Sequence, residues 1–136
     1  MKKNILLCVC SLFFLTAANA SAQEYNNLNI ECDETGFCKD KLGNPITGVV
    51  KKNYASGALE GEVSFKDGRQ DGIVKMYYES GALKTEMNFK GNLPDGIMNT
   101  YYESGVLEGT VNFKDGQKNG QGKWYYESGA IQAEVN

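Results

Sequence analysis

The sequence predicts an all-β protein, an elongated antiparallel β-meander built from 24-residue hairpin repeats. The first observation behind this prediction is a set of glycines spaced by that interval: Gly48, Gly72, Gly96 and Gly120. The second is the alternation of apolar and polar residues over 83–89, which is typical of a strand with one buried face. The third is a Glu-Ser-Gly turn that recurs at the same interval. Because one hairpin alone is marginal in water, we expect the units to stabilise one another.

The first element is a predicted signal peptide over residues 1–22. Lys2 and Lys3 precede a mostly apolar run over residues 5–15, and small residues follow up to Ala22. This run is short for a bilayer span, and a basic start with a small-residue exit is typical of a secretory leader. We therefore expect cleavage after Ala22, or alternatively after Ala20, and a mature protein that is periplasmic or secreted.

The second element, residues 23–47, is expected to cap the repeats, and it carries Cys32 and Cys38. In an oxidising compartment such an isolated pair forms a disulfide that closes a tight turn. A zinc site is the alternative. The chain has no histidine, so carboxylates such as Asp33 or Glu34 would have to complete that site. The sequence favours the disulfide and predicts no metal and no cofactor.

The third element, residues 48–136, is predicted to hold four hairpin units, the last one truncated. In the unit that begins at Gly72, a half rich in β-branched and aromatic residues precedes the turn Glu79-Ser80-Gly81, and an alternating half follows it. Glycine suits the end of such a turn because it tolerates a positive φ. Longer loops, such as residues 66–72, connect successive units. The truncated last unit predicts an unpaired edge strand. Either the polar residues Gln132 and Glu134 protect this C-terminal edge, or it pairs with a second copy in a homodimer.

The sequence offers little catalytic chemistry. Its serines at the repeated turn position have no histidine base available: Ser56, Ser80, Ser104 and Ser128. A net charge of −3 argues against nucleic acid as a partner, because such binding needs clustered Lys and Arg. Acidic residues outnumber basic ones over 48–136, so membrane association is not expected either. We therefore predict that the protein is not an enzyme.

The candidate binding residues are those that break the repeat. The position four residues after each leading glycine changes from unit to unit: Lys52, Met76, Thr100 and Trp124. Trp124 would either anchor a partner or cover the last unit.

Paired tyrosines supply a second set of candidates. Because alternate strand residues point to opposite faces, one face should display an aromatic row. That row is either Tyr77, Tyr101 and Tyr125 or Tyr78, Tyr102 and Tyr126. Such a row suits carbohydrate or an extended peptide, and it is also ordinary cross-strand packing.

Three segments carry a resemblance to a known family. They read Gly-Ile-Val-Lys-Met-Tyr-Tyr-Glu-Ser-Gly-Ala-Leu from Gly72, Gly-Ile-Met-Asn-Thr-Tyr-Tyr-Glu-Ser-Gly-Val-Leu from Gly96, and Asn-Gly-Gln-Gly-Lys-Trp-Tyr-Tyr-Glu-Ser-Gly from Asn119. The chain resembles the bacterial variant of the MORN (membrane occupation and recognition nexus) repeat over about residues 48–136. The resemblance implies a β-repeat sheet without catalytic machinery, used as a scaffold or binding surface.

The function expected from these features is that of an exported, non-enzymatic scaffold for protein interactions. A carbohydrate-binding module that uses the aromatic row is the alternative. Bacterial proteins that resemble this chain are often labelled antitoxin components of toxin–antitoxin systems, so an antitoxin-like partner of a toxin is a further alternative. An antitoxin for a cytoplasmic toxin must stay in the cytoplasm, whereas the leader predicts export.

Overall fold

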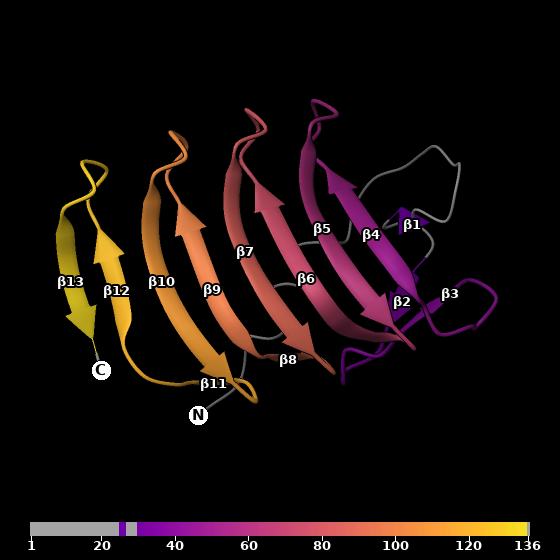
Figure 1. The fold of residues 1–136 in the computed structure, drawn as a ribbon. Coiled ribbons are helices and arrows are strands. Elements are labelled where there is room, and N and C mark those ends of the chain that lie inside the picture. The colour runs from indigo at the N-terminus through magenta and orange to yellow at the C-terminus, as the bar shows by residue number, and fades with distance from the viewer. Residues whose placement is uncertain (1–24, 27–29, 136) are drawn as a thin grey trace.

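The computed structural model describes residues 25–26 and 30–135, and the predicted signal peptide with its cleavage sites lies outside these residues. One curved sheet makes up most of the described chain (Figure 1). Its main strands are β4 (Gly48–Asn53), β5 (Leu59–Lys66), β6 (Arg69–Tyr77), β7 (Leu83–Lys90), β9 (Gly96–Tyr101), β10 (Leu107–Lys114), β12 (Gly122–Tyr125) and β13 (Ile131–Val135). Each pairs antiparallel with the next along the chain, so the predicted all-β meander is confirmed.

Five short strands complete the fold. β1 (Tyr25–Asn26) pairs with β4 in the parallel sense at one edge of the sheet. β8 (Leu93–Pro94) and β11 (Gln117–Lys118) pair with the ends of β7 and β10. β2 (Ile30–Cys32) and β3 (Cys38–Asp40) form a separate hairpin, which lies next to the β4–β5 end in Figure 1. We call residues 30–46, which contain this hairpin, the cap.

The two faces of the sheet differ in chemistry. On one face Val50 lies opposite Val63, Val63 opposite Val74, and Val74 opposite Met87. The buried cluster joins this face to Ile30, Cys38 and Ile46 of the cap, so we call it the cap face. On the other face Lys51, Glu62, Lys75 and Glu86 follow one another across four strands, and we call this the charged face.

The turns lie along the two long edges of the sheet. The Glu-Ser-Gly turns end in glycines with positive φ, for example 89° at Gly81, as the sequence predicts. At the opposite edge the expected loop over residues 66–72 is shorter than predicted. Asp67 and Gly68 alone make a two-residue turn with φ values of 49° and 78°, and β6 begins directly after it. Two successive positive φ angles match the twist of the flanking strands, so pairing continues closer to the turn.

Hydrogen bonds couple each unit to the next at both edges. At the Glu-Ser-Gly edge the Oη atoms of Tyr54, Tyr78 and Tyr102 donate to the carbonyls of Tyr77, Tyr101 and Tyr125, over 2.7, 2.8 and 2.8 Å. At the other edge the amides of Gly68, Asn92 and Gly116 donate to the carbonyls of Ile46, Gln70 and Pro94, over 2.8, 2.8 and 2.9 Å. These bonds recur with the repeat. They show how hairpins that are marginal alone stabilise one another.

Candidate binding surface

The cap covers the β4–β7 half of the cap face. Ile46 and Cys38 are fully buried, and they cluster with Val63, Phe65 and Phe89 of the sheet. Cys32 and Cys38 form the disulfide that the sequence predicts, with a Cα–Cα distance of 4.1 Å. The cap therefore supplies apolar cover that a single-layer sheet cannot provide for itself.

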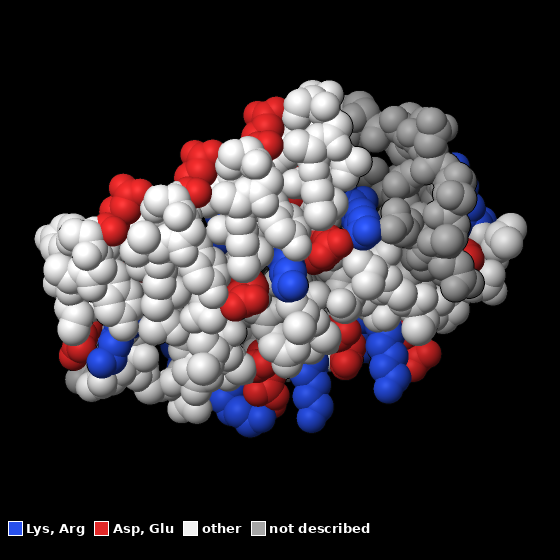
Figure 2. Space-filling model, turned by 45° about the horizontal axis from the view of Figure 1, so that its top comes forward, with Lys and Arg blue, Asp and Glu red and all other residues white. Residues whose placement is uncertain are grey.

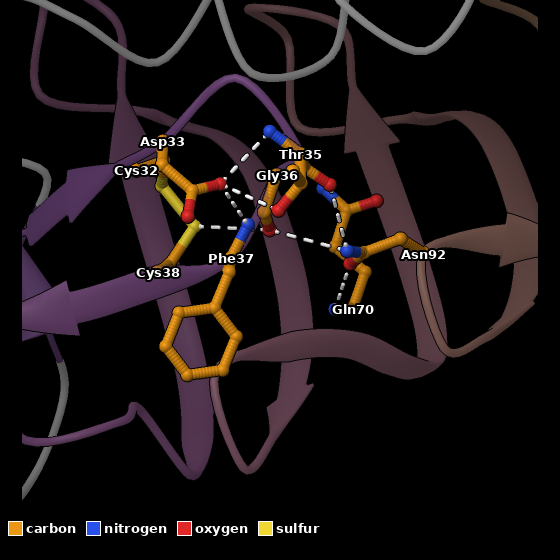
Figure 3. Close-up of a disulfide and its surroundings, with 8 residues drawn as sticks. All are labelled: Cys32, Asp33, Thr35, Gly36, Phe37, Cys38, Gln70 and Asn92. Carbon is orange, nitrogen blue, oxygen red and sulfur yellow. Dashed lines mark hydrogen bonds between the residues drawn. A yellow bond between two sulfur atoms is a disulfide. The ribbon is translucent and has the colours of Figure 1, made fainter.

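Asn92 ties the disulfide loop to the sheet (Figure 3). Its Nδ2 donates to the carbonyls of Thr35 and Gly36 over 3.2 and 3.3 Å, and its Oδ1 accepts from the Gln70 amide over 2.6 Å. The side chain is 5 % exposed, so these polar contacts are made away from solvent. Sequence reasoning missed this residue. The available signal was that Gly91-Asn92 stands where the other units have Asp67-Gly68 and Asp115-Gly116.

The disulfide loop is also ordered from within by Asp33. Its Oδ1 accepts from the Thr35 hydroxyl over 2.6 Å and from the Phe37 amide over 3.1 Å. These hydrogen bonds, the one from the Thr35 hydroxyl foremost, hold the pKa of the Asp33 carboxyl below its usual value. Asp33 therefore acts here as a turn residue.

Trp124 lies over β10 and β12 on the cap face. A Cβ atom built on Gly122 would lie 2.7 Å from the indole Cη2, and one built on Gly109 would lie 3.1 Å from Cδ1, so the ring lies across both glycines. Gly122 stands where the earlier units have Val50 and Val74. The indole therefore occupies space left by a glycine that itself breaks the repeat. Trp124 is half-buried, and it lies on the face opposite Lys123 and Tyr125.

A groove of about 270 Å³ runs beside the indole. It is lined by Val111, Lys118, Gly120, Gly122, Trp124 and Val135. Val111 is 6 % exposed, whereas Val135 is 55 % exposed. The groove thus combines an aromatic ring, aliphatic walls and a single basic side chain.

The charged face carries the predicted aromatic row. Tyr77 Oη donates to Glu62 over 3.2 Å, and Tyr101 Oη donates to Glu86 over 2.9 Å. Burial, and then the carboxylate partner, raises the pKa of each of these hydroxyls above 10.0. Of the two rows that the sequence allows, the structure places this one on a sheet face. In the fourth unit Tyr125 has Thr110 in place of the corresponding glutamate.

The members of the other tyrosine row lie at the Glu-Ser-Gly turns. The Tyr78 amide donates to Ala82, and its carbonyl accepts from Gly81, so this residue begins the turn. Its hydroxyl bonds the next unit, as described above. Tyr54, Tyr78 and Tyr102 of this row therefore couple repeats, whereas Tyr126 is 52 % exposed.

The charged face is internally paired over much of its length. Figure 2 shows basic and acidic side chains alternating there. Lys51 lies 3.6 Å from Glu62, and Lys123 lies 3.0 Å from Glu134. A hollow of about 540 Å³ on this face is larger than the groove beside Trp124, but Lys51, Glu62 and Lys75 line it and no aromatic ring does. We take the groove beside Trp124 as the stronger candidate site, because an aromatic anchor contributes more to binding than exposed ion pairs do.

The described residues offer no assembled metal centre: no group of three or more His, Cys, Asp or Glu within 25–26 and 30–135 could hold an ion. Within the same residues no helix is long and apolar enough to cross a membrane. Ser80 and its repeat counterparts lie in exposed turns.

Comparison with known protein families matches four segments of the chain to the MORN repeat variant, at residues 46–67, 70–90, 94–115 and 118–136. These segments cover more than half of the sequence. The chain belongs to the MORN repeat variant family. Each matched segment contains one hairpin of the MORN sheet with part of the adjoining loop edge. MORN repeats are commonly modules for protein interaction or binding. Searches of curated proteins and of solved structures returned no match.

Proposed function

We propose that this MORN-repeat protein is exported and acts, without catalysis, as a scaffold that binds a protein partner through the groove beside Trp124. The observation that carries the proposal is the seating of Trp124 on Gly109 and Gly122. Two glycines inside strands weaken a sheet, because they lose more entropy on folding and pack no side chain. A half-buried indole beside a groove offsets that cost when it recognises a partner.

The groove chemistry indicates an extended acidic segment with an apolar side chain as the occupant. Val111, Trp124 and Val135 suit the apolar side chain, and Lys118 suits a carboxylate near it. Lys118 is exposed and stands at the rim, where a charge guides the approach of a partner more than it adds affinity. Sugar recognition would call for several polar side chains around the ring, and the groove lining offers only Lys118 and the indole N–H of Trp124.

Export is supported by the leader pattern and by the disulfide. The Cys32–Cys38 bond suits an oxidising compartment, where such bonds persist. Deletion of residues 2–22 should trap the protein in the cytoplasm, whereas the full chain should appear in the periplasm or medium with a shortened N-terminus. Fractionation followed by N-terminal sequencing tests this. Retention of the full chain in the cytoplasm would overturn export and would favour the antitoxin-like alternative.

The absence of catalysis is supported by the lack of histidine and by the placement of the serines in turns. The same chemistry argues against a triad hydrolase. A turnover assay on the mature protein with ester, peptide and glycoside substrates is expected to match the buffer blank. Turnover that disappears on replacing a single repeat-breaking residue would overturn this part of the proposal.

The binding test uses a photo-crosslinking residue placed at Trp124, with one at Met76 as the matched control. Met76 holds the corresponding position in the second unit and lies over Gly61. We expect one envelope protein to crosslink at position 124 and not at position 76. The substitution Lys118→Glu should weaken that crosslink, because it reverses the charge at the groove rim.

The carbohydrate alternative is separated by fluorescence, because Trp124 is the only tryptophan in the chain. Titration with cell-wall polysaccharide should leave the emission unchanged. A saturable change, together with no position-specific protein crosslink, would overturn the scaffold proposal. Sugar binding on the charged face would instead be lost when Tyr77, Tyr101 and Tyr125 are replaced.

A further inference from the structure

The outer edge of β13 repeats the features that earlier units use to receive the next strand. In the described part of the chain β13 pairs with β12, and no described strand pairs with its other side. All of its residues are exposed, including Ile131 at 57 % and Val135 at 55 %. Ile131, Ala133 and Val135 alternate with polar Gln132 and Glu134. An exposed edge strand with this alternation is a template for pairing.

Tyr126 provides the second observation. Its counterparts Tyr54, Tyr78 and Tyr102 each donate a hydrogen bond to a carbonyl on the first strand of the next unit. The Tyr126 side chain is 52 % exposed, and no described residue accepts a hydrogen bond from its hydroxyl. The hydroxyl is thus positioned for a carbonyl on a strand added beside β13.

We propose that two copies of this protein associate through β13, antiparallel about a two-fold axis that passes by Ala133. The register follows from the repeat. Ala133 holds the repeat position of Gly61, and Gly61 lies opposite Met76 on the next strand. The Tyr54 hydroxyl bonds the carbonyl of Tyr77, the residue that follows Met76. With Ala133 opposite Ala133 of the second copy, the carbonyl one residue beyond is that of Glu134. Each Tyr126 hydroxyl therefore donates to the Glu134 carbonyl of the other copy. The two-fold axis makes these two hydrogen bonds equivalent.

The same register suits the side chains. It places Val135 opposite Ile131 of the second copy, and Glu134 opposite Gln132 on the charged face. Apolar residues therefore meet apolar ones, and no like charges lie directly opposite each other. Glu134 keeps its ion pair with Lys123 in its own copy. A two-fold contact of this kind closes on itself, so it produces a dimer and no filament.

The dimer extends the proposed function without depending on it. The cap faces of the two copies become one continuous surface with a Trp124 groove on each side of the axis. A partner with two binding segments would engage both grooves, and the second contact would be intramolecular. The interface is one strand pair and therefore small, so we expect a concentration-dependent monomer–dimer equilibrium.

Cysteine crosslinking tests the register. Residues directly opposite in an antiparallel pair have Cα atoms about 4.5–5.5 Å apart, within the reach of a disulfide, so Ala133→Cys should crosslink into dimers on oxidation. Gln132→Cys is the matched control on the same strand. Its two copies would be diagonal neighbours about 7–8 Å apart and should crosslink poorly. Equal crosslinking of both variants, or crosslinking of Gln132→Cys alone, would overturn the register.

Sedimentation velocity across a wide concentration range tests the association itself. The parent chain should show a dimer that Ala133→Lys abolishes, because a charge would then face the other copy on the apolar side. Tyr126→Phe removes two hydrogen bonds per dimer and should raise the dissociation constant about tenfold. Tyr102→Phe, which acts inside one copy, should leave that constant unchanged. A parent chain that stays monomeric at every concentration, or a dimer that survives Ala133→Lys, would overturn the proposal.

Discussion

The β4–β7 half of the sheet and the β9–β13 half are built from the same 24-residue unit, but their cap faces are covered in different ways. In the first half Ile30 and Cys38 come from outside the repeats and, with Ile46 at the start of the first repeat, close a continuous buried cluster. In the second half the cover comes from within the repeats, because Trp124 lies over Gly109 and Gly122. Val111 is buried there but is not part of the main cluster.

This difference shows what a repeat can and cannot specify. The repeated residues specify the strands, the turns and the hydrogen bonds between units. The burial of the apolar face is specified by residues that depart from the repeat, the cap and Asn92 at one end and Trp124 at the other. We therefore expect stability to depend mainly on the β4–β7 half, and binding on the β9–β13 half.

The largest expected effect distinguishes the two halves at one repeat position. Phe89 is 2 % exposed in the main cluster, whereas its counterpart Phe113 is half-buried. Phe89→Ala should lower the free energy of unfolding by about 3–5 kcal/mol, since a large side chain leaves a fully buried site. Phe113→Ala should cost less than half as much. Urea denaturation measures both, and equal losses would contradict the difference between the halves.

The second prediction concerns the glycine beneath Trp124. Gly122→Val restores the residue found at Val50 and Val74, so repeat similarity alone would suggest a gain in stability. The structure predicts the opposite, because the new Cβ would lie 2.7 Å from the indole. We expect the free energy of unfolding to fall by about 2 kcal/mol through overpacking.

A double variant shows whether this loss comes from the indole. The second unit combines Val74 with Met76, so Gly122→Val together with Trp124→Met should recover most of the stability. The double variant should then lose much less unfolding free energy than the sum of the two single losses, as expected for residues in contact. Additive effects in a thermal denaturation series would show that the indole does not rest on Gly122.

The third prediction tests how the cap is held. Asn92→Gly should lower the free energy of unfolding by about 1–2 kcal/mol, because the hydrogen bonds that the Asn92 side chain makes with the Gln70 amide and the loop carbonyls are lost. Glycine accommodates the φ of 72° at this position, so backbone strain does not contribute. If Asn92 acts through the disulfide loop, reduction of Cys32–Cys38 should destabilise the variant less than it destabilises the parent. If reduction destabilises the variant as much as the parent, Asn92 does not act through the disulfide loop.

The smallest effect concerns the coupling between units. Tyr78→Phe removes one hydrogen bond to the Tyr101 carbonyl and should cost about 1 kcal/mol in the free energy of unfolding. Tyr126→Phe at dilute, monomeric concentration should cost almost nothing, because no described residue accepts from that hydroxyl. Chemical denaturation of the two variants side by side measures this. A comparable loss for both would show that the hydroxyl bonds do not couple the units.

Much of the fold could be predicted from the sequence, because its signals are local and repeated. The period specifies the hairpins, the alternation specifies the strand faces, and the glycine at position 81 specifies a positive φ, each through backbone or pleat geometry that any one unit carries. The Cys32–Cys38 disulfide follows from the isolation of the pair. The prediction was wrong at residues 66–72, where pairing continues almost to the turn because Asp67 and Gly68 both adopt positive φ.

The tertiary contacts could not be predicted, because they join residues far apart in the chain. Nothing in the sequence near Asn92 indicates that its amide bonds Thr35, although the Gly-Asn order marks it as unusual. The sequence singled out Trp124 but not Gly122, since a glycine among many carries no signal until it is compared position by position with Val50 and Val74. The sequence allowed either of two tyrosine rows to lie on a sheet face. The hydrogen bonds of Tyr77 and Tyr101 to Glu62 and Glu86 put the row Tyr77, Tyr101 and Tyr125 on the charged face.

The central claim is that the capped half of the sheet is its stable part and that β12–β13 is a low-stability surface available to partners. Native-state amide hydrogen exchange on the dilute monomer tests this residue by residue. The account predicts the slowest exchange in β5, β6 and β7 and the fastest strand exchange in β12 and β13. Uniform protection across the sheet, or slower exchange in β12 than in β6, would contradict it.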